Sequence, residues 1–278
     1  MAPEQAKPSD IDVTAELAPG PLLRIGRGPL SVDIAPVAGG RVAQVMFDGV
    51  AWLADYSPQN QTAIAWGSFP MLPWAGRVRH GKFDFHGPRQ LPVNLGDHAI
   101  HGVALLLPWQ VDEHSATHVE LSLPLPRDHR WPFGGRAHQR IEARERALHM
   151  TLSVTAGEQA MPATLGWHPW FLKPDRLDFQ PSRYYPRDAD GMATLPLAEP
   201  PPGPWDDCFI NEQPVVLARG PQQLRLTSSC DHWVVYDQPA HATCVEPQSG
   251  PPDAFNLGSA QQLEPGATLS AWYRLAWD

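Results

Sequence analysis

Apolar and polar residues alternate along much of this chain in short runs, with a period of two residues. Such alternation places successive side chains on opposite faces of an extended strand. The clearest runs lie at residues 31–37, 41–47, 118–125, 222–229, 232–238 and 269–277. The run at 138–156 alternates twice and predicts two strands joined by a tight turn near residues 144–146. Many short strands separated by turns predict an all-β fold, a large antiparallel β-sandwich.

The domain organisation follows from how turn residues are distributed. The 278 residues include 32 prolines and 22 glycines, which punctuate the whole length, and helical periodicity is hard to find. The proline-rich stretch at 198–207 predicts an internal loop, because strand-like alternation resumes directly after it. We therefore predict a single domain over residues 21–278. Residues 1–20 are polar and proline-rich, unlike a signal peptide, and predict a disordered N-terminal tail.

Composition and charge narrow the class of partner. Hydrophobic residues make up 42% of the chain, enough for a sizeable core, and the formal net charge is -9 without a long basic run. This charge argues against nucleic acid and against an anionic membrane surface as partners. No apolar stretch approaches the roughly 18 residues that span a bilayer.

The cysteines indicate the compartment. There are three, Cys208, Cys230 and Cys244, without a Cys-x-x-Cys motif. They predict reduced thiols in a cytoplasmic protein, and a disulfide between two of them is the alternative. The sequence leaves the oligomeric state open.

Arginine and histidine residues form the first candidates for a site. Arg77 and Arg79 are two residues apart, so an extended backbone would project both to one side. Arginine suits oxygen-rich ligands, and a solvated arginine at a strand edge is the alternative. His98 and His101 are three residues apart, but no third metal ligand is evident nearby. Hydrogen-bonding histidines are therefore favoured over a metal site.

Two further candidates stand directly before prolines. His168 precedes Pro169 and Glu246 precedes Pro247, and a residue before proline favours extended backbone. Glu246 ends an apolar run, so its carboxyl group is expected to be partly buried, with a raised pKa that suits a general base. A glycosidase would need a second acid near it, for which Asp207 is the only good candidate.

The chain lacks the signatures of several other enzyme classes. There is no Gly-x-Ser-x-Gly nucleophile motif and no Walker-type phosphate loop. Eleven tryptophans offer flat apolar faces on which the C–H face of a sugar ring can stack. The residues thus point to a sugar-like ligand and acid–base chemistry that needs no metal.

Five short motifs follow one another between residues 70 and 257. They are Gly76-Arg77 with Gly81-Lys82-Phe83, His101-Gly102 with Trp109, His168-Pro169-Trp170-Phe171, Asp207-Cys208-Phe209, and Glu246 with Ala254-Phe255-Asn256. In kind and order they resemble the motifs of the aldose 1-epimerase (galactose mutarotase) superfamily. The resemblance implies the galactose mutarotase-like supersandwich fold. It also implies cofactor-free interconversion of the α and β anomers of a free sugar, the small-molecule partner.

The resemblance also implies roles for individual residues. Glu246 would be the general base that takes the proton of the C1 hydroxyl, and His168 the general acid that protonates the ring oxygen. His101 and Arg77 would hydrogen-bond the sugar, and Asp207 would hold ring hydroxyls. As an apolar wall we expect, from composition, Trp74, Trp170 and Trp233.

Two departures from the family pattern leave alternatives open. The family usually has Tyr-Phe-Asn-Leu after His-Pro, whereas this chain lacks the asparagine at Leu172. A related branch that acts on hexose 6-phosphates has an arginine where this chain has Leu105, although Arg79 or Lys82 could replace it. The alternatives are thus a hexose-6-phosphate 1-epimerase, or a non-catalytic carbohydrate-binding or sensing protein.

Overall fold

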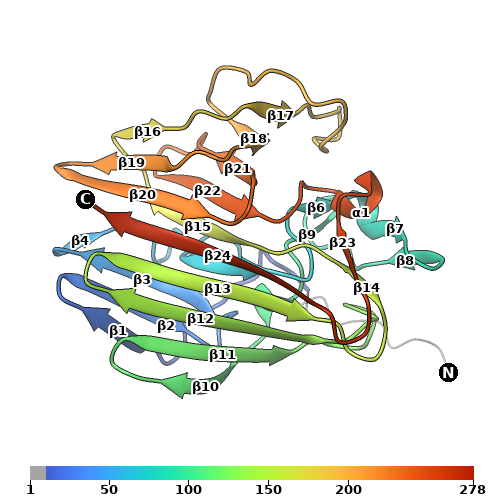
Figure 1. Ribbon diagram of the computed structural model, residues 1–278, viewed down its shortest axis with the longest axis horizontal. Coiled ribbons are helices and arrows are strands. Elements are labelled where there is room, and N and C mark those ends of the chain that lie inside the picture. The colour runs from blue at the N-terminus through green and yellow to red at the C-terminus, as the bar shows by residue number, and fades with distance from the viewer. Residues whose placement is uncertain (1–10) are drawn as a thin grey trace.

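The computed structural model describes residues 11–278, which form two large antiparallel sheets packed around a common core (Figure 1). The first sheet has ten strands in the order β1-β2-β3-β5-β15-β22-β21-β18-β17, with β4 attached to β3. These strands are β1 (Leu23–Arg27), β2 (Leu30–Ala35), β3 (Arg41–Phe47), β4 (Val50–Ala51), β5 (Ser68–Met71), β15 (Gly166–Leu172), β17 (Arg183–Tyr185), β18 (Asp206–Ile210), β21 (His232–Tyr236) and β22 (Ala242–Gln248).

The second sheet has eight strands in the order β10-β11-β12-β13-β24-β20-β19-β16. They are β10 (Gln110–His114), β11 (His118–Pro124), β12 (Arg136–Arg144), β13 (Ala147–Thr155), β16 (Arg176–Asp178), β19 (Val215–Arg219), β20 (Gln222–Ser228) and β24 (Thr268–Trp277). Short ribbons and single turns join the sheets: β6 (Arg77–Val78) with β9 (Ala99–Ile100), β7 (Lys82–Asp84) with β8 (Pro88–Gln90), β14 (Met161–Ala163) with β23 (Gln261–Leu263), η2 (Arg79–Gly81), η3 (Ala104–Leu106) and α1 (Ala254–Leu257).

The predicted all-β sandwich is confirmed, and so are the strands expected from alternation. The run at 138–156 is the hairpin β12–β13, in which Arg144 pairs with Ala147 across the tight turn. The proline-rich stretch at 198–207 is a loop up to Asp206, where β18 begins. Alternation succeeded because these antiparallel strands bury one face against the core and turn the other outwards.

The core lies between the two sheets and backs the strands that carry the candidate residues. Trp167 of β15 and Trp233 of β21 are fully buried, and both contact the ring of Tyr273 on β24 in the opposite sheet. The Tyr273 hydroxyl donates a hydrogen bond to the carbonyl of Val245 on β22 at 3.4 Å. Strand alternation then turns the neighbours of these residues to the outer face of the ten-stranded sheet.

The N-terminal segment differs in part from the prediction of a tail over residues 1–20. Residues 1–10 lie outside the described residues. Val13, however, is fully buried beside Phe69 and Met71, and Glu16 forms a β-bridge with Thr62. The folded part of the chain therefore begins before residue 20, because the apolar side chain of Val13 in this polar segment packs into the core.

Two further expectations can be compared with the structure. All three cysteines are free and buried, and none is disulfide-bonded. Within residues 11–278, no helix is both long and apolar enough to cross a membrane.

Candidate active site

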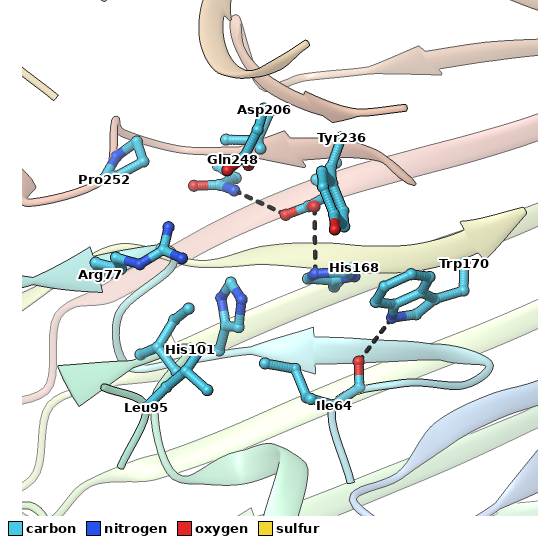
Figure 2. Close-up of a pocket in the computed structure, with 14 residues that line it drawn as sticks. Ile64, Arg77, Leu95, His101, His168, Trp170, Asp206, Tyr236, Gln248 and Pro252 are labelled. Carbon is cyan, nitrogen blue, oxygen red and sulfur yellow. Dashed lines mark hydrogen bonds and ion pairs between the residues drawn. The ribbon is translucent and has the colours of Figure 1, made fainter. Parts of the chain in front are cut away.

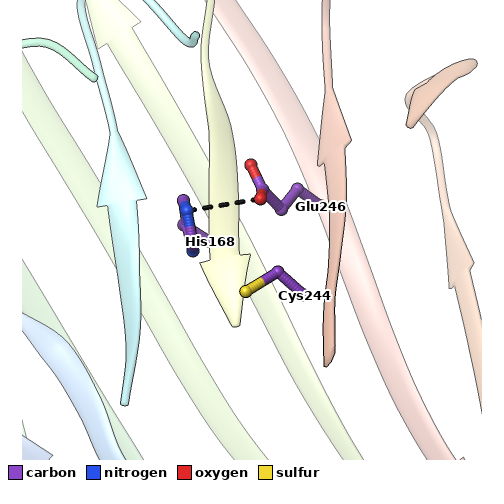
Figure 3. Close-up of side chains that lie close together, drawn as sticks. All are labelled: His168, Cys244 and Glu246. Carbon is purple, nitrogen blue, oxygen red and sulfur yellow. Dashed lines mark ion pairs between the residues drawn. The ribbon is translucent and has the colours of Figure 1, made fainter. Parts of the chain in front are cut away.

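The pairing of β15 with β22 brings the two candidate acid–base residues face to face. Gly166 pairs with Gln248 and Trp170 pairs with Cys244. His168 follows Gly166 by two residues on β15, and Glu246 precedes Gln248 by two residues on β22. Because the strands are antiparallel, His168 and Glu246 lie opposite each other. The His168 Nε2 and a Glu246 carboxylate oxygen are 3.2 Å apart (Figure 3).

The two prolines explain why this pair sits in a gap of the sheet. Between the Gly166 and Trp170 pairs no residue of β15 is paired with β22. Proline has no backbone N–H to donate, and Pro169 and Pro247 both fall within this interval. Each proline is instead paired with the strand on its other side: Pro169 with Ser68 on β5, and Pro247 with Trp233 on β21. The sheet therefore stays continuous on both sides, while β15 and β22 are not paired with each other at His168 and Glu246.

Burial sets the proton affinity of the pair. The His168 and Glu246 side chains are only 7% and 3% exposed. Burial lowers the pKa of His168 from 6.5 to about 3. Burial, and then the charge of Asp206, raise the pKa of Glu246 well above 4.5. Both shifts favour the uncharged forms of the two side chains.

A cavity of about 270 Å³ opens above this pair (Figure 2). Its lining includes four of the predicted site residues: Arg77, His101, His168 and Glu246, together with the predicted wall residue Trp170. Arg77 comes from β6, and no ion pair is found for its guanidinium among residues 11–278. It therefore remains available to a ligand oxygen. Trp170 stacks on His168 with ring centroids 5.4 Å apart, and its indole N–H donates to the Ile64 carbonyl at 2.7 Å.

The His101-Gly102 motif has a backbone explanation. His101 adopts a φ of 60°, a left-handed conformation that is uncommon for a residue with a side chain. Gly102 follows with a φ of 75°, and a Cβ there would lie 1.9 Å from the Leu72 carbonyl oxygen. Only glycine fits this approach. The turn holds the His101 ring edge-on to His168, with centroids 5.0 Å apart.

The structure corrects the prediction for Asp207. Asp206, not Asp207, lines the cavity. Asp207 pairs with Val235 and so projects to the opposite face of β18, the face that carries core residues such as Phe209. A shift of one residue along a strand exchanges the faces, and the sequence does not fix that register. Asp206 also accepts a hydrogen bond from Arg187 at 2.7 Å.

Two of the predicted tryptophans are core residues and do not line the cavity. Trp74 is 1% exposed and packs against Trp131 at 5.9 Å. Trp233 is 1% exposed and lies on the inner face of β21. Composition could not separate these from Trp170, because all three belong to apolar stretches. Strand register decides the face that Trp170 and Trp233 occupy, and Trp74 lies in the loop between β5 and β6.

Several residues of the cavity are not among those predicted from the sequence. Gln248 lies two positions after Glu246 on the same strand face, and its amide donates to the Glu246 carboxylate at 3.2 Å. That spacing was a usable signal. Tyr236 gave none, since it lies on a neighbouring strand. Val234 lies on the same strand as Tyr236, β21, and Gly76 belongs to the Gly76-Arg77 motif. The remaining lining comes from loops and short ribbons far apart in sequence: Ile64, Leu95, Ile100 and Pro252.

One group of side chains has the composition of a metal-ligand set. The donor atoms of His168, Cys244 and Glu246 all lie within 4.8 Å of one another (Figure 3). A cation needs thiolate and carboxylate ligands, whereas burial raises the pKa of both Cys244 and Glu246. The arrangement therefore suits proton transfer better than permanent metal binding.

The His98–His101 pair is divided between two roles. His98 accepts a hydrogen bond from the His80 backbone N–H at 3.1 Å, as expected for a hydrogen-bonding histidine.

Among the possible phosphate ligands, Arg79 is held by Asp188 and by Asp190, the latter at 2.9 Å.

Over most of its length the chain is similar to one family of known proteins. A family model described as aldose 1-epimerase matches residues 21–276. The Escherichia coli K12 protein YihR, named as uncharacterized, is 26% identical over 270 residues, which cover 86% of this chain and 87% of its own.

Two crystal structures share the fold. A galactose mutarotase-like protein from Clostridium acetobutylicum superposes with a TM-score of 0.83 at 16% identity, covering 92% of this chain and 95% of its own. Galactose 1-epimerase from Lactobacillus acidophilus NCFM gives 0.78 at 19% identity, with 92% and 94% covered. The galactose mutarotase-like fold is thereby confirmed, and the chain belongs to the aldose 1-epimerase family.

Proposed function

We propose that this protein is an aldose 1-epimerase that interconverts the α and β anomers of a free, non-phosphorylated aldose. The observation that carries the proposal is the buried contact of 3.2 Å between His168 and Glu246 at the base of the cavity. Acid–base catalysis of ring opening needs one group that takes a proton and one that gives a proton, both within reach of the same sugar.

The proposed reaction starts from the charge-separated form of the pair. The Glu246 carboxylate takes the proton of the C1 hydroxyl while C1=O forms. The bond between C1 and the ring oxygen breaks, and the ring oxygen takes a proton from the His168 imidazolium. Rotation about C1–C2 presents the other face of the carbonyl, and the reverse proton transfers close the ring. The two residues thus exchange roles within each cycle.

The directions of the pKa shifts of His168 and Glu246 fit this cycle. Ring opening leaves Glu246 protonated and His168 neutral, which is the form that burial favours. The pair therefore stabilises the open-chain stage, and ring closure restores the charge-separated form, because Glu246 gives its proton to the C1 oxygen while His168 takes the proton of the C5 hydroxyl. Arg77 and His101 would hold sugar oxygens beside the pair. Gln248, Tyr236 and Asp206 would bind the ring hydroxyls near C1.

Two rival functions are less well supported. Leu105, which stands where the phosphosugar branch has an arginine, is fully buried, and Arg79 is engaged by aspartates. Phosphate therefore lacks a free partner at these two positions, and Lys82, the other candidate, lines a different pocket. A non-catalytic sugar-binding protein would not need a buried glutamate held against a histidine, since that arrangement costs stability.

Polarimetry on freshly dissolved α-anomers tests the proposal. Wild-type protein should accelerate the optical relaxation of at least one of glucose, galactose, xylose or arabinose. Glu246→Gln and His168→Asn should each lower that rate by roughly 10²–10⁴-fold. Unchanged rates in both variants would show that the assigned pair is wrong. Binding without acceleration would instead support the sugar-binding protein, and a preference for hexose 6-phosphates would support the phosphosugar epimerase.

A further inference from the structure

The lining of the cavity changes from polar to apolar across the sheet. The relevant strands lie in the order β5-β15-β22-β21-β18. On the β22 side of His168 the lining has four polar residues, Glu246, Gln248, Tyr236 and Asp206, and one apolar residue of β21, Val234. On the β5 side, Phe69 stacks on the His168 ring with centroids 4.7 Å apart.

An apolar cluster covers the β5 side. Phe69, Ile100 and Leu105 are buried there, and Ile64, Leu95 and Trp170 pack against them. Four of these residues line the cavity and are here called the apolar wall: Ile64, Leu95, Ile100 and Trp170. Figure 2 shows Ile64 and Leu95 on the opposite side of His168 from the contact with Glu246.

Two polar groups beside the apolar wall, the Ile64 carbonyl and the Asn94 side chain, already have partners. The Ile64 carbonyl accepts the Trp170 indole N–H at 2.7 Å. The Asn94 side chain accepts from the Ile100 N–H at 2.8 Å and donates to the Ile100 carbonyl at 3.3 Å. These two groups are thus occupied within the protein, and the free side chains beside the wall, His101 and Arg77, are those that the proposed function assigns to other sugar oxygens.

The proposed pose sets which part of the sugar meets this wall. In an aldopyranose the ring oxygen is bonded to C1 on one side and to C5 on the other. With the C1 hydroxyl at Glu246 and the ring oxygen at His168, C5 must lie on the far side of His168. Its substituent then points towards β5 and the apolar wall.

We propose, on the basis of the function proposed above, that the preferred substrate is a 6-deoxyhexose, whose C5 carries a methyl group. The methyl group would pack against Leu95 and Ile64 and remove apolar surface from water. The C6 hydroxyl of an ordinary hexose would be desolvated there without a hydrogen-bond partner. A pentose, with only hydrogen at this place, fits but leaves the wall unfilled.

Matched sugars isolate the contribution of this one position. D-fucose differs from D-galactose only in lacking the C6 hydroxyl, and 6-deoxy-D-glucose differs from D-glucose in the same way. Magnetisation-transfer NMR measures the enzyme-catalysed exchange between anomers for each sugar. We expect kcat/KM for the 6-deoxy sugar to exceed that of its parent by roughly 10–100-fold, the range over which an apolar pocket discriminates. Equal values, or a preference for the hexose, would overturn the inference.

A pair of variants tests the wall itself. Leu95→Asn places an amide on the apolar wall and should shift the preference at least several-fold towards the hexose. Val93→Asn is the control, because Val93 belongs to the same segment, is 40% exposed and does not line the cavity. It should leave the ratio unchanged. If Leu95→Asn also leaves the ratio unchanged, the C5 substituent does not meet this wall.

A binding measurement separates this inference from the proposed function. If no sugar shows accelerated exchange, the proposed epimerase activity fails. The dissociation constants of D-fucose and D-galactose, measured by calorimetry on Glu246→Gln protein, do not depend on turnover. Tighter binding of D-fucose would still support the apolar wall as the site of the C5 substituent, and tighter binding of D-galactose would refute it.

Discussion

Glu246 is a group whose proposed role conflicts with its environment. Its carboxylate is buried, and burial raises its pKa well above 4.5. The folded state therefore holds this proton more tightly than the unfolded chain does. The free energy of unfolding must then fall as the pH rises from about 4.5 through the raised pKa, by at most about 1.4 kcal/mol per pH unit.

Glu246→Gln should remove this loss of stability with rising pH. The variant is expected to be more stable than the wild type at pH 7–8, with a difference that shrinks as the pH falls towards 4.5. Urea unfolding at several pH values measures it. Glu158→Gln is a matched control, since the Glu158 side chain is 88% exposed. A difference that does not depend on pH would show that Glu246 is not the titrating group.

His168 produces the opposite dependence at acid pH. Its pKa falls from 6.5 in the unfolded chain to about 3 in the folded protein, because of burial. The unfolded chain then binds the proton first, so stability should decrease as the pH falls from about 6.5 to about 3. His168→Asn should weaken that decrease, as urea unfolding at pH 6.5 and pH 4.5 would reveal. An equally steep decrease in the variant would place the titration elsewhere.

At the residue scale, sequence motifs singled out Glu246 and His168, and the structure brings the two side chains into contact at the cavity. The motifs failed at Asp207, where the neighbouring Asp206 lines the cavity. Two adjacent aspartates are equally plausible in sequence, and only hydrogen bonding to β21 decides which one faces outwards. Such a choice depends on long-range pairing, which local patterns do not contain.

At the element scale, the unusual feature is a pair of central strands with a proline in each. Pro169 and Pro247 lie where pairing between β15 and β22 is interrupted. Each also biases the preceding residue towards extended backbone. We infer that the prolines keep the two strands from closing their hydrogen bonds across the site, so that His168 and Glu246 face the cavity.

Pro169→Ala and Pro247→Ala test this role. Each restores a backbone N–H that can pair across the gap and shift the side chains, so turnover should drop roughly 10-fold or more. Stability should change by less than about 1.5 kcal/mol, the net contribution of one hydrogen bond. Pro88→Ala, an exposed proline of β8, is the control. The idea fails if the losses of turnover and of stability merely track each other in thermal unfolding and polarimetry.

At the scale of the whole molecule, the cavity depends on segments that meet only in the folded chain. Alternation predicted the sandwich and many of its strands. It did not predict that β15 lies between β5 and β22, because these strands are separated by long stretches of sequence. The apolar wall has the same origin, since Ile64 and Leu95 come from loops without a periodic pattern. Local sequence thus specifies the elements, and packing specifies the cavity.

One long-range contact joins the cavity to the connection between β17 and β18, residues 186–205. Arg79 of η2 forms ion pairs with Asp188 and Asp190 of this connection, and its backbone N–H donates to Asp253 at 2.9 Å. The same connection bears Arg187, which binds Asp206 in the cavity lining. Arg79 therefore links the connection to β6, the strand that bears Arg77.

Arg79→Ala should release this connection without unfolding the protein. Partly exposed ion pairs contribute up to about 1 kcal/mol, so amide hydrogen exchange over residues 186–192 should accelerate roughly 3–5-fold. The two sheets do not depend on the contact, and exchange in β15 and β22 should stay unchanged. Arg127→Ala, which removes an exposed pair with Glu158 at 3.3 Å, is the control. If residues 186–192 exchange at the wild-type rate in Arg79→Ala, their own hydrogen bonds, such as that from the Met192 N–H to Asp188, hold the connection in place instead.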